Sequence, residues 1–123
     1  MKHSEKRLYL IKKLLLEQPQ YKGIEIPDNT DEQKKLLRSL MNIRPPYSIE
    51  EEFLKIQDEY LGEEVLKRGI TDSNTLPVSP IHNRLILWRG DITTLKIDAI
   101  VNAANSALRG CFIPCHSCVD NMI

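Results

Sequence analysis

Apolar side chains in the first seventy residues recur at intervals of three and four, which is the spacing of one face of an α-helix. Three such segments are separated by loops, and helices are predicted over residues 4–18, 30–44 and 48–68. Ser4, Thr30 and Ser48 are the expected N-caps, because their hydroxyls can accept hydrogen bonds from the first unpaired backbone N–H groups. Residues 1–70 are therefore predicted to form an all-helical N-terminal extension.

The pattern changes after this extension. Residues 71–83 contain mixed turn residues and are predicted to be a linker. Two short apolar runs follow, RLILW at 84–88 and IDAIVN at 97–102. Short runs of this kind, bounded by turn residues, are typical of strands that are buried on both faces of a mostly parallel sheet. The fold class predicted for residues 84–123 is therefore α/β.

Composition excludes several classes of protein. The chain has 123 residues, of which 41% are hydrophobic and 28% charged, with 17 basic and 17 acidic side chains. This balance gives no reason to expect binding to nucleic acid or to an anionic membrane. No apolar run approaches the roughly 20 residues of a membrane-spanning helix. Lys12 and Lys13 interrupt the apolar N-terminal stretch, which does not resemble a signal peptide, so a cytoplasmic location with reduced thiols is predicted.

All three cysteines and one of the three histidines lie within eight residues, at Cys111, Cys115, His116 and Cys118. Cys111, His116 and Cys118 could bind Zn²⁺ and leave its fourth position open. Alternatively, Cys111, Cys115 and Cys118 have a C-x3-C-x2-C spacing that could hold a [4Fe–4S] cluster with one free iron, as in radical S-adenosylmethionine enzymes. A third interpretation is that these are simply buried free cysteines.

Polar residues near the ends of the predicted strands are further candidates. Asp91 could accept a hydrogen bond from an exocyclic amine such as that of adenine, or it could cap a turn. Asn102 and Asn105 could hold a sugar hydroxyl or brace their own loop. Asp120 could position a water, act as a general base or cap a helix.

Three short segments together resemble the opening half of a macrodomain, the ADP-ribose-binding fold. They are GDIT at 90–93, DAIVNAANS at 98–106 and VDN at 119–121. In hydrolytic macrodomains a glycine-rich loop leads to the aspartate, whereas here residues 110–118 carry the cysteines and His116. This replacement, together with LLRSLMNIRPP at 36–46, resembles the zinc-dependent macrodomains of bacteria. Those proteins are similar to protein-ADP-ribose hydrolases found beside a sirtuin-type transferase and a lipoyl-carrier protein.

The resemblance covers the chain from about Leu8 onward and favours zinc over an iron–sulfur cluster. It implies an incomplete, macrodomain-like α/β fold in residues 84–123, preceded by the helical extension and the linker. Two candidate strands are too few to bury both faces of a sheet. We therefore expect the sequence to be the N-terminal part of a longer protein, inactive alone and poorly ordered over residues 84–123.

The resemblance also implies a role for each candidate residue. Asp91 would accept from the adenine amine beside the backbone of Ile92, and Asn102 would shape the distal-ribose end of the site. Asn105 would lie nearest that sugar, and Asp120 matches the aspartate of hydrolytic macrodomains. The expected zinc ligands are Cys111, His116 and Cys118, and Cys115 would be a bystander.

The implied activity is the zinc-dependent removal of mono-ADP-ribose from modified proteins, with a lipoyl-carrier protein as one candidate substrate. Two other functions stay open from the sequence. One is a non-catalytic ADP-ribose-binding module, and the other is a structural zinc-binding remnant.

Overall fold

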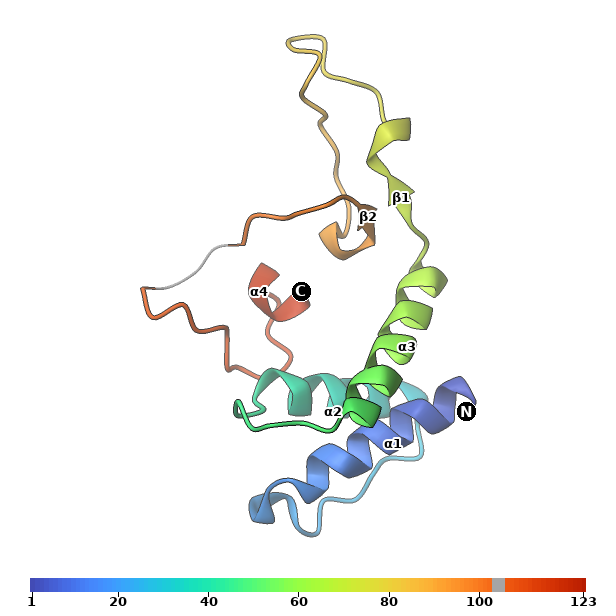
Figure 1. Cartoon of the computed structure of the whole chain (residues 1–123), viewed down its shortest axis with the longest axis vertical. Helices are drawn as coiled ribbons and strands as arrows, with labels where there is room; N and C mark the ends of the chain where they lie inside the picture. The colour runs from blue at the N-terminus through green and yellow to red at the C-terminus, as the bar shows by residue number, and fades with distance from the viewer. Residues whose placement is uncertain (103–105) are drawn as a thin grey trace.

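The computed structural model describes residues 1–102 and 106–123, and its N-terminal part consists of three helices. These are α1 (His3–Leu16), α2 (Thr30–Asn42) and α3 (Glu51–Arg68), which pack together in Figure 1. The remaining elements are short: η1 (Pro19–Tyr21), β1 (Thr71–Asp72), η2 (Ser73–Thr75), η3 (Ile92–Thr94), β2 (Leu95–Lys96) and α4 (Val119–Met122). Within the described residues, no helix is both long enough and apolar enough to cross a membrane.

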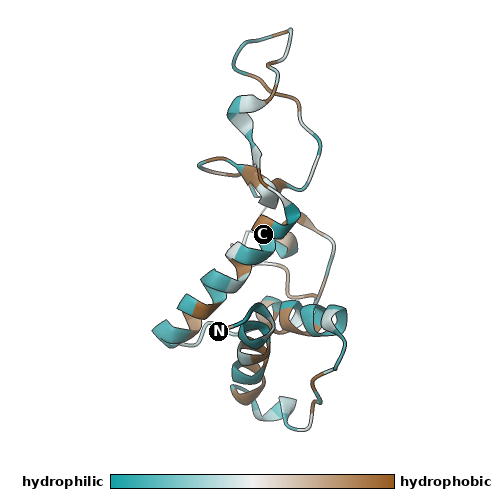
Figure 2. Cartoon of the chain, turned by 90° about the vertical axis from the view of Figure 1, so that its right-hand side faces the viewer, coloured by the Kyte–Doolittle hydropathy of each residue, from teal (hydrophilic) through white to brown (hydrophobic). Residues whose placement is uncertain are grey.

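The hydrophobic core lies between the three long helices. Its buried side chains come from all three: Leu10, Ile11, Leu14, Leu37, Leu40, Phe53, Ile56 and Tyr60. Helix α1 contacts both α2 and α3, so it is the central element of the bundle. Figure 2 shows apolar residues on these helices and also along the irregular segment above them. The predicted three-helix N-terminal part is therefore present.

The helix starts differ from the predicted ones. Ser4, Thr30 and Ser48 are not the N-caps; the caps are Lys2, Asn29 and Glu50. The side chain of Asn29 accepts from the backbone N–H groups of Asp31 at 2.8 Å and Glu32 at 3.2 Å. The amide oxygen of Asn29 thus satisfies two backbone donors that would otherwise be unpaired. Thr30 is therefore not needed as the cap and is the first residue of α2. The predicted end of the third helix is confirmed, because Gly69 caps α3 with a φ of 86°.

The only sheet within the described residues is a two-stranded parallel one, in which Thr71 pairs with Leu95 and Asp72 with Lys96. The strands predicted at 84–88 and 97–102 are wrong, although both segments lie inside the described part of the chain. Leu87, for example, is 93% exposed. An isolated strand leaves a row of unpaired backbone groups on each side, and it needs neighbours that these residues do not have here.

The architecture is thus helix-rich with a small parallel sheet, which is compatible with an incomplete α/β domain. That residues 84–123 form part of a macrodomain stays a prediction.

Candidate metal centre

The loop before α4, residues 110–118, is called the metal loop below. It brings together the three residues that were predicted to bind zinc. The ligand atoms of Cys111, His116 and Cys118 all lie within 4.8 Å of one another. The Sγ of Cys111 is 3.5 Å from the Nδ1 of His116. Zn–S and Zn–N bonds of about 2.3 and 2.0–2.1 Å in a tetrahedral site place two such ligand atoms about 3.6 Å apart. The donor set and the spacing therefore fit a zinc ion.

The environment of Cys118 favours the form of the side chain that binds metal. The pKa of its thiol is lowered, first by the hydrogen bond to His116 and then by the backbone N–H of Asn121. Because the thiolate is the metal ligand, a thiol with a lowered pKa gives up its proton more readily when a cation binds.

Cys115 is turned toward helix α2. Its Sγ lies 3.4 Å from the carbonyl oxygen of Lys35, and its backbone N–H donates to the Oδ1 of Asn42 at 3.3 Å. It has a φ of 55° and lies in a turn that is closed by the hydrogen bond from the backbone N–H of His116 to the carbonyl oxygen of Ile113. These contacts favour the Cys–His–Cys set over the three-cysteine set.

Asp120 connects the metal loop to the segment that contains Asn102. Its Oδ1 accepts from the Nδ2 of Asn102 at 3.0 Å, and its Oδ2 accepts from the backbone N–H of Cys111. A Cβ at position 110 would lie only 3.0 Å from that Oδ2, so Gly110 permits the close approach. Asn102, Asp120 and the metal loop thus meet in one place. Asn105, the other predicted catalytic residue, lies outside the described residues.

Asp91 lies elsewhere, at the C-terminal end of α3. It is the N-cap of η3 and accepts from the backbone N–H and the hydroxyl of Thr93 at 2.9 and 2.7 Å. Its Oδ2 accepts from the Nη1 of Arg68 at 2.9 Å. The Thr93 hydrogen bonds, followed by the charge of Arg68, lower the pKa of the Asp91 carboxyl. In this structure Asp91 caps a turn, with Ile92 beside it as the first residue of η3, and its adenine-binding role stays a prediction.

Two residues at this site were not identified from the sequence. The Nη2 of Arg38, on α2, donates to the carbonyl oxygen of His116 and to the Oδ1 of Asn121. The Nδ2 of Asn121 donates to the carbonyl oxygens of Cys111 and Ile113. Both residues lie in segments that carry the family resemblance, but no local signal distinguishes them, since their contacts join positions far apart in the chain.

The described residues form a helix-rich chain with a small parallel sheet, compatible with an incomplete α/β domain, and a candidate three-ligand metal centre next to a carboxylate. No protein-family model matches the chain. The chain is 57% identical over its whole length to a protein-ADP-ribose hydrolase of Treponema medium, of which it covers 48%. It is 39% identical over its whole length to the protein-ADP-ribose hydrolase of Staphylococcus aureus strain MRSA252, of which it covers 46%.

A third relative is similar over a shorter region. It is a probable bifunctional ADP-ribose hydrolase/ADP-ribosyltransferase of Fusarium oxysporum f. sp. cubense, 40% identical over 97 residues, which are 72% of this chain and 16% of that protein. The predicted resemblance to protein-ADP-ribose hydrolases is confirmed, since the chain is homologous to part of these proteins. The chain spans about half the length of the curated hydrolases it matches.

Proposed function

We propose that this chain forms part of a zinc-dependent hydrolase that removes mono-ADP-ribose from modified proteins. One observation supports this most directly. The three predicted zinc ligands lie together beside Asp120, in a chain that is similar along its whole length to proteins named protein-ADP-ribose hydrolase.

Cys111, His116 and Cys118 would hold the zinc ion. Three protein ligands leave one coordination position for water or substrate, as in catalytic zinc sites. A zinc ion held by these three residues would polarise an oxygen at the ribose–protein junction, or lower the pKa of a water in the open position toward about 7. To bind the metal, both cysteine thiols must be deprotonated and the histidine imidazole must be neutral. Zinc binding should therefore weaken at acid pH.

Asp120 would position the attacking water. An ionised carboxylate offers about four lone-pair sites. The Asn102 amide and the Cys111 backbone N–H occupy one on each oxygen. The remaining sites can accept from a water next to the metal loop. Because both hydrogen bonds hold the carboxylate in place, that water would be aligned before the substrate binds.

Asn102 and Asn105 would hold the distal ribose. The Asn102 amide is oriented by its hydrogen bond to Asp120, so its carbonyl oxygen can accept from a sugar hydroxyl. Asn105 is proposed to lie nearest the sugar and to orient the reacting carbon. At the other end of the ligand, Asp91 would accept from the adenine amine, with the backbone of Ile92 alongside.

The substrate would be a protein that carries a single ADP-ribose on a side chain. A lipoyl-carrier protein as that substrate, and a cytoplasmic setting for the reaction, are further proposals that rest on the sequence resemblance alone.

The test uses a chimera in which this chain replaces the matching part of the Treponema medium hydrolase. The chimera is incubated with a mono-ADP-ribosylated protein, and released ADP-ribose is measured by chromatography. We expect Cys118→Ala to abolish release while some affinity for ADP-ribose is retained. Cys115→Ala, which removes a thiol from the same loop but not a proposed ligand, should retain the activity.

Three results would contradict the proposal in different ways. Unchanged release after verified removal of the metal would exclude zinc from the reaction. ADP-ribose binding without release, in the unmutated chimera, would indicate a binding module. Stoichiometric zinc without affinity for ADP-ribose would indicate a structural zinc site.

A further inference from the structure

The metal loop is held by a helix of the N-terminal part. Along α2, the carbonyl of Lys35, the guanidinium of Arg38 and the amide of Asn42 each contact the segment between Cys111 and Asn121. These contacts join residues 73 to 83 positions apart in the sequence. The same segment carries all three proposed zinc ligands, so α2 has a direct influence on their positions.

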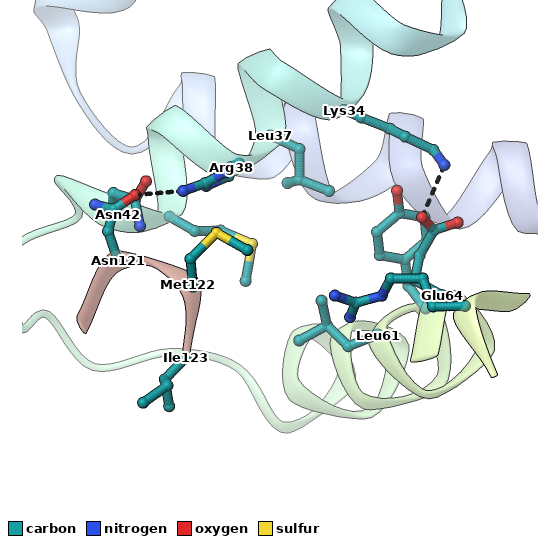
Figure 3. A pocket seen from close by; sticks show the side chains of 12 residues that line it. Lys34, Leu37, Arg38, Asn42, Leu61, Glu64, Asn121, Met122 and Ile123 are labelled. Atoms are coloured by element: carbon teal, nitrogen blue, oxygen red, sulfur yellow. Dashed lines mark hydrogen bonds and ion pairs between the residues drawn. The ribbon is translucent and has the colours of Figure 1, made fainter. Parts of the chain in front are cut away.

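Arg38 makes the central contacts. Its Nη2 donates to the carbonyl oxygen of His116 at 2.7 Å and to the Oδ1 of Asn121 at 2.9 Å. Figure 3 shows the second contact as a dashed line, at one end of an open cavity of about 410 Å³ between α2, α3 and α4. One guanidinium nitrogen therefore bridges the backbone of a proposed ligand and the side chain of the residue next to Asp120.

Asn121, which accepts a hydrogen bond from Arg38, also contacts the first half of the metal loop. Only 6% of its surface is exposed, and its Nδ2 donates to the carbonyl oxygens of Cys111 at 3.3 Å and Ile113 at 3.1 Å. Through Asn121, Arg38 also orients the backbone of the first proposed ligand. The backbones of Cys111 and His116, which lie five residues apart, are thus held by one connected set of hydrogen bonds.

We propose that Arg38 is a positioning residue of the metal centre, which arranges the Cys111–His116–Cys118 ligands before the ion binds. This inference rests on the zinc site of the proposed function. A loop that is already ordered loses less conformational entropy when it binds metal, and its affinity is higher for that reason. The helical part of the chain would therefore set the metal affinity of a site to which it contributes no ligand.

An arginine suits this role better than a lysine. The guanidinium is planar and presents its donors in a rigid arrangement, so both acceptors can be bridged with little loss of side-chain freedom. The ammonium of a lysine is a more strongly hydrated point charge on a flexible stem. Arg38→Lys should therefore retain only part of the metal affinity that Arg38 provides.

The experiment measures zinc affinity of the 123-residue chain by competition with a chromophoric chelator, and ligand geometry from the absorption of the Co²⁺-loaded chain. Removing residues that orient metal ligands typically lowers affinity about 10- to 100-fold, and we expect a loss in this range for Arg38→Ala. Asn121→Asp keeps the acceptor for Arg38 but removes both donors to the loop, and it should also weaken binding. Arg84→Ala, at an exposed arginine on another segment, is the matched control and should leave the affinity unchanged.

Helix content and the urea midpoint of each metal-free variant separate positioning from folding. The inference is supported if Arg38→Ala weakens zinc binding while both quantities stay at the wild-type value. It is overturned if Arg38→Ala binds zinc as tightly as Arg84→Ala, or if the metal-free variant loses its helices. A wild-type chain that binds no zinc would instead contradict the zinc site itself, which is a separate failure.

Discussion

Two leucines on helix α1 offer a matched test of the hydrophobic core. Leu10 is 0% exposed and Leu16, six residues later on the same helix, is 83% exposed. Replacing a fully buried leucine by alanine costs about 2–5 kcal/mol, because apolar contacts are lost and a cavity remains. A helical part of about 70 residues is expected to have a free energy of unfolding of about 3–10 kcal/mol, at roughly 0.05–0.15 kcal/mol per residue. Leu10→Ala should therefore remove a large share of its stability.

The assay is urea unfolding of the full 123-residue chain, followed by far-ultraviolet circular dichroism, which reports on the three long helices. We expect a clearly lower midpoint for Leu10→Ala with an unchanged slope, since the area exposed on unfolding is similar. Leu16→Ala should change the free energy of unfolding by no more than about 0.5 kcal/mol. Equal effects of the two substitutions, or a wild-type chain without a cooperative transition, would refute the three-helix core.

Two further predictions concern the same helices. Burial raises the pKa of the Glu64 carboxyl, but hydrogen bonds from Lys34, His3 and Lys67 outweigh it and lower that pKa to about 2. The stability this gives is present above the ordinary carboxyl pKa of about 4.3 and should be lost as the pH falls toward 2, so urea midpoints measured across this range should fall less in Glu64→Gln. Asn29→Ala removes the acceptor at the start of α2 and should cost about 1 kcal/mol in the same unfolding assay, whereas Asn29→Asp should retain most of it.

The helices could be predicted because their signals are local. In α3 the sequence alone predicts an apolar face of Ile49, Phe53, Ile56 and Tyr60. The last three are buried, and Ile49, which precedes α3, is half-buried against the core. In α1 the sequence alone predicts an apolar face of Leu8, Ile11 and Leu15, and of these only Ile11 is buried, because the buried face consists of Leu10, Ile11 and Leu14. The segment LYLIKKLLL has apolar residues on several sides, so its periodicity alone does not select one face, and packing against α2 and α3 decides it.

The closeness of the three proposed metal ligands could be predicted for a similar reason. Cys111, His116 and Cys118 lie within eight residues, so their closeness needs little from the rest of the fold. The role of Arg38 could not be predicted, because it depends on how α2 lies against a loop 78 residues away. The predicted strands failed for the opposite reason. An apolar run is a strand only where neighbouring strands pair with it, and that pairing is not encoded in the run itself.

The proposed function combines two activities, metal binding and ADP-ribose binding, which depend on different parts of the chain. In the proposed function, metal binding would need the loop that carries the three proposed ligands and the helix α2 that contacts it, and both are present in the structure. ADP-ribose binding, as proposed, would need Asp91 and Asn102 on the walls of one cleft. In the structure Asp91 is paired with Arg68 at the end of α3, whereas Asn102 is paired with Asp120 beside the metal loop. The 123-residue chain is therefore expected to bind zinc even where its affinity for ADP-ribose is weak, and only the chimera tests whether the two sites act together.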